Sequence, residues 1–380
     1  MSQQRGRWAF AGTVLVAACS SSEVHEAPAP LEDLPDASYA DAGVDVPVPD
    51  RAPECEECRI YPDDCEPEAF CPVAAPLETS ARLLAIAGSS PHAVWVAGSM
   101  GAVLSFDGQS WARDPSFENG TFGALLLRGA DEIWLGGTLT TSYVRSSALP
   151  SDAGASGWTP VSAGADGVAG IQAMWAAPDG TWVWIGLSNT SIYRVPTLSR
   201  VRREGATLVR GGAAPVPGPI ILAMNGLDGL SKDEVWAVGE RGTAYRITGA
   251  DGTTPVVQAF NTQTENALNA VALASENDIW AVGNVGTVRR YRGTDATWER
   301  VDVPTIQSLR AVKAASPVDV WAVGDGATVL HFDGAEWARV PIGGLGGARP
   351  NLRAVLPFGH DRALVVGDRI ILELRAKEGR

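Results

Sequence analysis

A short phrase recurs along the 380-residue chain and constrains its fold more than any other feature. A valine or isoleucine, a tryptophan, two apolar residues and a glycine follow one another at Val94–Gly98, Val235–Gly239, Ile279–Gly283 and Val320–Gly324. Self-similarity at a period of about 40 to 50 residues is typical of folds that stack copies of one supersecondary unit. The sequence therefore predicts a repeat scaffold, on which function depends on the sites that the scaffold carries.

One complete copy, residues 309–341, shows how the unit is built. Four short runs rich in Val, Leu, Trp or Phe are separated by turns at Ser316-Pro317, Asp325-Gly326 and Asp333-Gly334. Such runs predict four strands joined by tight hairpins. The second run is apolar on both faces, so both sides need cover, and a propeller blade packed between two neighbouring blades receives it.

Counting the glycine that ends the second strand gives seven copies, including a degraded third copy near Gly186 in which the tryptophan is shifted by one place. The last copy stops after a third strand, Ile370 to Leu374, so the N-terminal side must supply the fourth, and Pro72 to Leu77 stands where that strand is needed. We predict an all-β fold, a seven-bladed β-propeller of four-stranded blades over residues 72–375. Six or eight blades are the alternatives, because long insertions blur copies three and four.

The extended repeat supports a resemblance. Trp-Ala-Val-Gly-x-x-Gly, an apolar strand and then Phe-Asp-Gly-x-x-Trp, at Phe106–Trp111 and Phe332–Trp337, resemble the bacterial propeller repeats of the Ycf48-like photosystem assembly and BNR/Asp-box families. The resemblance covers residues 82–375 and implies propeller architecture. Through the Ycf48-like repeats it also implies an envelope assembly factor as one candidate function.

The N-terminal residues have the features of an export signal. Two arginines precede an apolar run from Trp8 through Ala18, which is too short to span a bilayer and is followed by Cys19. Val16–Cys19 resembles a bacterial lipobox, which implies that Cys19 carries the lipid and becomes the mature N-terminus. We therefore predict a signal peptide at 1–18 and an exported outer-membrane lipoprotein, facing the periplasm or the surface. Ordinary cleavage after Ala18 is the alternative.

The net charge of −14 is concentrated near the N-terminus, since residues 20–80 alone carry it and the rest of the chain is balanced. A neutral body gives no electrostatic footprint for nucleic acid, so we predict no nucleic-acid partner. Residues 19–54 are rich in Pro, Ala, Asp and Glu, which predicts a disordered tether because little apolar surface is available for burial. Residues 376–380 form a short C-terminal tail.

Four cysteines follow the tether, at Cys55, Cys58, Cys65 and Cys71. An exported protein meets an oxidising compartment, so we predict two disulfides that make residues 55–71 a small Cys-rich staple. Three pairings are open. A zinc or iron-cluster site is the alternative, and we predict neither metal nor cofactor.

No motif in the chain predicts a catalytic site. The sequence lacks His-Glu-x-x-His, Gly-x-Ser-x-Gly and a phosphate loop, and the position of His331 is occupied by Ser105 and Arg290 in other copies. We therefore interpret His331 as an exposed strand residue. Most of the thirteen tryptophans recur at repeat positions, which favours packing between blades over a sugar-stacking surface.

A candidate ligand rim follows from the alternation of strand direction, which brings the turns after second strands and the connections between blades to one end. Ser99, Glu240, Asp325 and Asp368 occupy those turns. The connections from about 196 to 219 and 248 to 267 exceed what the repeat requires, and such loops often carry binding. The first is basic through Arg200, Arg202 and Arg203, and a tolerated, solvated insertion is the alternative.

Together these features favour a monomeric, lipid-anchored envelope propeller that binds an unidentified protein or glycan and touches the membrane only through its lipid. A carbohydrate-active hydrolase or lyase, with carboxylates that converge across blades, is the alternative from a different class. The enzyme question is left open by the sequence, with binding favoured.

Overall fold

The fold is taken from a computed structural model, which describes residues 56–129, 132–138, 141–146, 157–161, 170–188, 197–205, 207–212, 215–217, 222–293 and 297–374. All of them belong to one compact unit, Pro53–Arg380. The predicted signal peptide, Cys19, the tether, Cys55 and the C-terminal tail lie outside the described residues. No helix among the described residues is long and apolar enough to cross a membrane.

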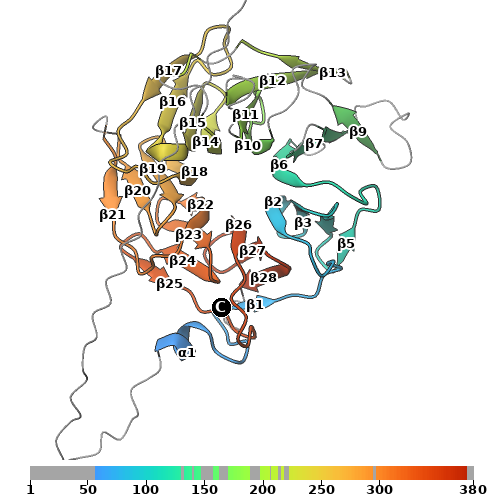
Figure 1. Ribbon diagram of the computed structural model, residues 1–380, viewed down its shortest axis with the longest axis vertical. Coiled ribbons are helices and arrows are strands. Elements are labelled where there is room, and N and C mark those ends of the chain that lie inside the picture. The colour runs from blue at the N-terminus through green and yellow to red at the C-terminus, as the bar shows by residue number, and fades with distance from the viewer. Residues whose placement is uncertain are drawn as a thin grey trace, which may run out of the picture. The chain divides into compact units, whose positions relative to one another are not determined.

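The described chain forms seven four-stranded antiparallel sheets, which follow one another around a ring as blades 1 to 7 (Figure 1). This confirms the predicted seven-bladed propeller. Blades 1 and 2 consist of β2 (Leu83–Ser90), β3 (Ala93–Gly98), β4 (Val103–Phe106), β5 (Trp111–Arg113), β6 (Phe122–Arg128), β7 (Glu132–Gly137), β8 (Ser142–Ser146) and β9 (Trp158–Val161). Blades 3 and 4 consist of β10 (Ile171–Trp175), β11 (Val183–Leu187), β12 (Leu198–Glu204), β13 (Thr207–Arg210), β14 (Met224–Ser231), β15 (Glu234–Gly239), the 3₁₀ turn η1 (Glu240–Gly242), β16 (Ala244–Thr248) and β17 (Val256–Ala259).

Blades 5 and 6 consist of β18 (Leu268–Ser275), β19 (Asp278–Gly283), β20 (Val288–Tyr291), β21 (Glu299–Val301), β22 (Leu309–Ser316), β23 (Asp319–Gly324), β24 (Thr328–Phe332) and β25 (Trp337–Arg339). Blade 7 consists of β26 (Leu352–Pro357), β27 (Ala363–Gly367), β28 (Ile370–Leu374) and, from the other end of the chain, β1 (Phe70–Pro72). A short helix, α1 (Glu56–Ile60), precedes β1.

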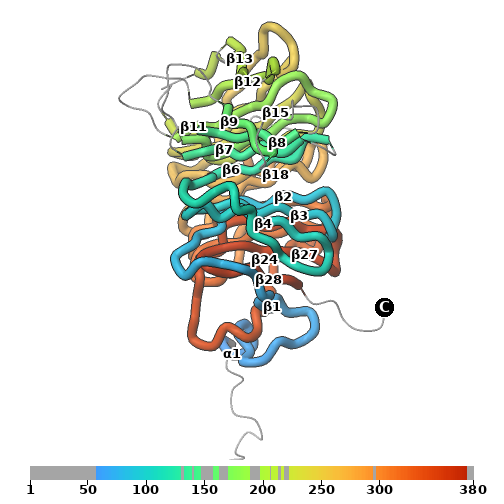
Figure 2. Tube along the Cα trace, turned by 90° about the vertical axis from the view of Figure 1, so that its right-hand side faces the viewer, coloured from blue at the N-terminus to red at the C-terminus, as the bar shows by residue number. Residues whose placement is uncertain are grey.

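Blade 7 is closed by the N-terminal side, as the sequence predicts, but by an earlier segment. Phe70 pairs with Leu374 and Pro72 with Leu372, so the closing strand is β1 and not Pro72 to Leu77 (Figure 2). The reason lies in the packing of Phe70, which is fully buried and meets Trp321 edge to face at 5.8 Å. The closing strand thus starts within the segment predicted to be the Cys-rich staple.

Aromatic pairs join neighbouring blades. The second-strand tryptophan of one blade meets the fourth-strand tryptophan of the next edge to face, in Trp95–Trp158 at 6.0 Å, Trp236–Trp298 at 5.7 Å and Trp280–Trp337 at 5.3 Å. Each such pair contributes roughly 0.5 to 1.5 kcal/mol beyond the burial of its area. Phe70 takes the place of the fourth-strand tryptophan against Trp321, so closure repeats the same contact.

The repeated glycine ends the second strand because another backbone lies against it. A Cβ on Gly98 would clash with the carbonyl oxygen of Arg82, and one on Gly324 with that of Ser308. In blade 3 the position belongs to Leu187, since Leu187 pairs with Ile171 as Gly98 pairs with Leu83. The assignment of the third copy to Gly186 was therefore wrong by one residue. Trp184 is the blade 3 tryptophan and is buried like its counterparts.

Antiparallel strands give the ring two distinct ends. The turns between second and third strands lie at the same end as the connections between blades, and we call this end the connection rim. The turns between first and second strands and between third and fourth strands lie at the opposite rim.

Candidate functional site

The connection rim carries a polar residue directly after the second strand of every blade. Each donates its backbone N–H to the carbonyl that precedes the first strand, at 2.9 to 3.0 Å. The seven positions are Ser99, Thr138, Ser188, Glu240, Asn284, Asp325 and Asp368. The predicted rim residues Ser99, Glu240, Asp325 and Asp368 are therefore equivalent in the structure and lie on one rim.

The side chains of these rim residues make different hydrogen bonds and ion pairs. The Ser99 hydroxyl accepts the backbone N–H of Arg82 at 2.9 Å, and Glu240 accepts that of Ala223 at 3.2 Å, so both brace the start of a first strand. Asp325 binds Arg310, with Nε to Oδ1 at 2.9 Å. Asp368 contacts the guanidinium of Arg353 at 3.4 and 3.5 Å. The two rim aspartates are thus committed to ion pairs, whereas Glu240 is bound to the backbone.

A repeated β-bulge positions those arginines. In every blade the register of the first strand shifts at its second residue. A bulge adds an unpaired residue and redirects its side chain. The second residues are Leu84, Gly123, Gln172, Asn225, Asn269, Arg310 and Arg353, and all seven line a central cavity of about 190 Å³.

The channel is asymmetric in polarity as a result. Blades 1 and 2 present Leu84 and Gly123, whereas blades 6 and 7 present Arg310 and Arg353. The hydrogen bonds that Arg310 donates to Asp325 hold the pKa of Arg310 above its ordinary value, although burial opposes that shift. This ring of residues was not predicted from the sequence. Its signal is the residue after the large apolar residue that opens each first strand, as in Leu309-Arg310 and Leu352-Arg353.

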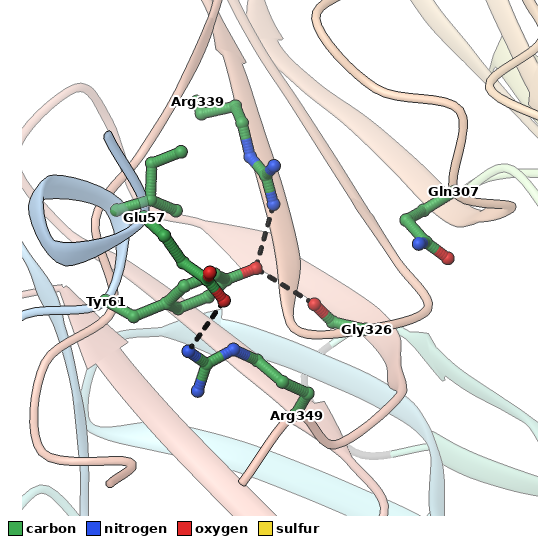
Figure 3. A pocket seen from close by; sticks show the side chains of 7 residues that line it. Glu57, Tyr61, Gln307, Gly326, Arg339 and Arg349 are labelled. Atoms are coloured by element: carbon green, nitrogen blue, oxygen red, sulfur yellow. Dashed lines mark hydrogen bonds and ion pairs between the residues drawn. The ribbon is translucent and has the colours of Figure 1, made fainter. Parts of the chain in front are cut away.

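A cavity of about 620 Å³ lies on the connection rim where α1 meets blade 6 (Figure 3). Tyr61, directly after α1, donates its hydroxyl to the carbonyl oxygen of Gly326 at 3.0 Å and accepts Nη2 of Arg339 at 2.8 Å. The guanidinium of Arg349 lies 3.7 Å from the centre of the Tyr61 ring and 3.5 Å from Glu57. Two arginines and one exposed carboxylate therefore face this cavity.

A second cavity, of about 670 Å³, shares Arg349 with the first. It is lined by the turn of blade 7 at Asp368 and Arg369, and by Glu78 on the segment from β1 to β2. Glu78 pairs with Arg113 at 2.6 Å. The connection between blades 6 and 7, which contains Arg349, therefore separates two adjoining cavities on one rim.

The structure overturns the placement of the predicted basic loop. Residues 196–219 include β12 and β13, and 248–267 include β17, so both stretches supply blade strands. Arg200 is 2% exposed, and its Nη1 donates to the carbonyl oxygens of Ala250 at 2.8 Å and Gly252 at 2.7 Å. It stacks 4.5 Å from the ring of Trp182. Burial lowers the pKa of Arg200, and the charge of Asp251 opposes that shift.

The two other predicted arginines are also engaged within the scaffold. Arg202 pairs with Glu204 at 2.6 Å, and Arg203 pairs with Glu132 of blade 2 at 2.9 Å. These contacts lie towards the opposite rim, where β12 ends. The sequence did not predict this strand because β12 contains three arginines and a glutamate among its seven residues, and these charged residues hide the strand pattern.

The prediction that the repeat tryptophans are buried is confirmed, whereas the prediction that His331 is exposed is wrong. Trp134, Trp236, Trp280, Trp298, Trp321 and Trp337 are buried, as predicted for packing between blades. His331 is not an exposed strand residue, because its side chain is 13% exposed and stacks on Trp321 at 4.1 Å. Its Nε2 lies 2.8 Å from Oδ1 of Asp319.

Three of the four cysteines predicted to form disulfides lie within the described residues. Cys58 is disulfide-bonded, whereas Cys65 is a thiol in the structure, which differs from the expected pair of disulfides. Cys65 lies on an irregular stretch against Gly344, and Cys71 is buried in β1. The pairing of the four cysteines stays a prediction, since Cys55 lies outside the described residues.

No protein-family model matches the sequence, and no curated protein matches it. Among solved structures, Ycf48 bound to D1 peptide superposes with a TM-score of 0.63 at 15% identity, over 83% of this chain and 98% of that one. Ycf48 from Cyanidioschyzon merolae gives 0.58 at 19% identity, over 82% and 100%. The extracellular domain of the one-component system BT4673 from B. thetaiotaomicron gives 0.60 at 13% identity, over 82% of this chain but 40% of that one. At these identities the likeness shows the fold, and the chain is a seven-bladed propeller structurally similar to Ycf48 and to the BT4673 propeller.

Proposed function

We propose that the protein is a binding module that holds an extended peptide segment of an envelope protein on the connection rim over blades 6 and 7. The observation that carries the proposal is the pair of cavities, of about 620 and 670 Å³, that adjoin at Arg349. An extended chain spans about 3.3 Å per residue, so a few residues suffice to cross both. A likeness to a Ycf48 structure with a bound peptide supports the same class of partner.

The chemistry of the rim favours a partner with carboxylates. Arg339, Arg349 and Arg369 line the two cavities, whereas the carboxylates of Glu78 and Asp368 are already bound by Arg113 and Arg353. Nε of Arg339 is buried and has no acceptor among the described residues. Arginine donates in a planar fork that matches a carboxylate, so these side chains suit acidic side chains or a chain terminus.

A peptide fits this rim better than a glycan. Sugars are commonly held by exposed aromatic faces, but the tryptophans of the repeat are largely buried between blades. The aromatic residue in the first cavity, Tyr61, is covered by the guanidinium of Arg349. This rim therefore offers mainly charge and hydrogen bonds, and the Tyr61 ring is already stacked with a guanidinium.

Site-specific photo-crosslinking in cells tests the proposal. A benzophenone amino acid at Gln307, which lines the first cavity, should capture one envelope protein. The same group at Val318, which is 59% exposed on the opposite rim of the same blade, should not. Equal capture from both positions would refute the assignment to the connection rim.

The affinity of the protein for the captured segment then tests which residues form the binding site. A synthetic peptide from that segment should bind the purified protein, and Arg349→Glu should weaken binding at least about tenfold because it places a like charge against the ligand. Arg300→Glu is the matched control, since Arg300 lies on an outer strand and is 72% exposed. Unchanged affinity of the Arg349→Glu variant would exclude Arg349 from the site.

We further propose that a lipid on Cys19 holds this module at the outer membrane and that residues 19–54 act as its tether. The support is the lipobox-like Val16–Cys19 and the acidic, proline-rich segment that follows it. The several acyl chains of a bacterial lipoprotein anchor far more firmly than one chain. Cys19→Ala should release the protein from the membrane fraction and abolish metabolic lipid labelling, and retention with full labelling would disprove the anchor.

A further inference from the structure

Two of the chain's four histidines meet a buried aspartate at the opposite rim, away from the proposed peptide site. Asp319 opens β23, His331 lies in β24, and His360 lies in the turn between β26 and β27 of the next blade. One ligand atom from each of the three lies within 4.8 Å of the others. The rings of His331 and His360 have centroids 5.0 Å apart, so the cluster bridges blades 6 and 7.

The cluster replaces a purely structural contact found in other blades. In blade 5 the corresponding pair is Asp278 with Arg290, and in blade 4 it is Glu234 with Arg246. Arginine has no lone pair to offer a metal, whereas an imidazole does. Blade 6 therefore has a ligating group where blades 4 and 5 have a guanidinium, and blade 7 adds a second imidazole beside it.

Neighbouring side chains fix the orientation of the cluster. Trp321 donates its indole N–H to Oδ1 of Asp319 at 2.7 Å and stacks on the His331 ring with an interplanar angle of 25°. Among the described residues, Oδ2 of Asp319 accepts no hydrogen bond, so an oxygen remains for a ligand. Such outer contacts orient ligands in known metal sites and lower the cost of assembling them.

We propose that Asp319, His331 and His360 bind a divalent transition-metal ion of the zinc class, with solvent completing its coordination. Two imidazoles and one carboxylate match the ligands of zinc and of its neighbours copper and nickel, whereas calcium and magnesium take oxygen ligands. Metal–ligand bonds of about 2.0 to 2.1 Å place ligand atoms roughly 3.3 Å apart in a tetrahedral site. Nε2 of His331 and Oδ1 of Asp319 share a hydrogen bond at 2.8 Å, so an ion bound between them would replace the shared proton and need only a small separation of the two side chains, and the exposed His360 supplies the remaining movement.

Zinc titration of the untagged full chain tests the site by calorimetry. Because cysteine thiolates also bind zinc, the protein is first treated with EDTA and its thiols are alkylated, identically in every variant. The parent should bind one zinc ion per chain, and its melting temperature should rise with zinc because the ion binds the folded state. With Co²⁺ as probe, visible absorption should report imidazole coordination.

Two variants and one control assign the binding to the cluster. His331→Arg rebuilds the carboxylate–guanidinium pair of blade 5 and so preserves the fold, and His360→Ala removes an exposed side chain. Each should weaken zinc binding at least about tenfold. His92→Ala changes the exposed histidine in the corresponding turn of blade 1 and should leave binding unchanged. No stoichiometric zinc on the parent, or parental affinity in both variants, would overturn the site.

Discussion

Blades 5 and 6 place a carboxylate, a tryptophan and a nitrogen base at the same three positions, yet the two arrangements differ in their chemistry. In blade 5 Asp278 uses both oxygens on Arg290, at 2.6 and 2.7 Å, and Nε1 of Trp280 is buried with no partner among the described residues. In blade 6 Oδ1 of Asp319 accepts both the Trp321 indole and His331. In blade 5 the guanidinium occupies both oxygens of the carboxylate, whereas His331 contacts a single oxygen of Asp319, which the Trp321 indole shares. In blade 4 Glu234 binds both Arg246 and the indole of Trp236, so a carboxylate can also hold an arginine and an indole together.

The base in blade 5, an arginine, carries a permanent charge, whereas the base in blade 6, a histidine, is charged only when it is protonated. Arginine carries a permanent positive charge, so Arg290, whose guanidinium lies 4.3 Å from the centre of the Trp280 ring, requires its carboxylate at all times. His331 can lose its proton. Burial lowers the pKa of His331 and is opposed by the hydrogen bond and charge of Asp319, while His360 adds to the lowering. The same blade position thus forms a permanent ion pair in blade 5 and holds a side chain that can bind a ligand in blade 6.

The largest expected effect comes from removing the two carboxylates in parallel. Asp278→Ala should lower the free energy of unfolding by about 3 to 5 kcal/mol, because it leaves a buried guanidinium without a counter-charge. Asp319→Ala should cost less, about 1 to 3 kcal/mol, because a neutral imidazole and the Trp321 indole lose a hydrogen-bond acceptor but no permanent charge loses its partner. Urea denaturation in EDTA measures both, and equal losses would show that blade 6 also carries a fixed charge.

A smaller difference should separate the two tryptophans. Trp321→Phe and Trp280→Phe remove the same atoms, but only Trp321 donates a hydrogen bond, at 2.7 Å, to a described residue. Trp321→Phe should therefore cost about 1 kcal/mol more free energy of unfolding than Trp280→Phe. The same denaturation assay provides the comparison, and a larger cost for Trp280→Phe would mean that its indole nitrogen has a partner such as water.

The smallest effect is expected from converting one blade into the other. His331→Arg should change the free energy of unfolding by less than about 1 kcal/mol, since blades 4 and 5 already accommodate arginine between a carboxylate and a tryptophan. Thermal unfolding of the metal-free protein checks this. A loss comparable to that of Asp278→Ala would show that blade 6 is shaped for imidazole alone.

The sequence predicted the positions that every blade shares, and it did so for a local reason. A tryptophan and a glycine three residues apart mark a strand that is covered on both faces and ends against another backbone, as Trp321 and Gly324 do. The polar residues after that glycine, Asp325 among them, follow from the same pattern. The pattern did not identify the end of the second strand in blade 3, because Leu187 stands there in the place of the glycine.

The remaining features depend on which blades become neighbours. Arg200 is separated from Ala250 by fifty residues and His331 from His360 by almost thirty, so no local pattern shows that either pair meets. Arg349 and Tyr61 are brought together only because blade 7 is closed from the other end of the chain. The sequence by itself predicted seven blades, with six or eight as alternatives, and it located the buried tryptophans and the polar rim, because these features recur in successive repeats. Only the tertiary structure decided the closing strand, the two cavities at Arg349 and the histidine cluster, because ring closure sets the contacts between repeats.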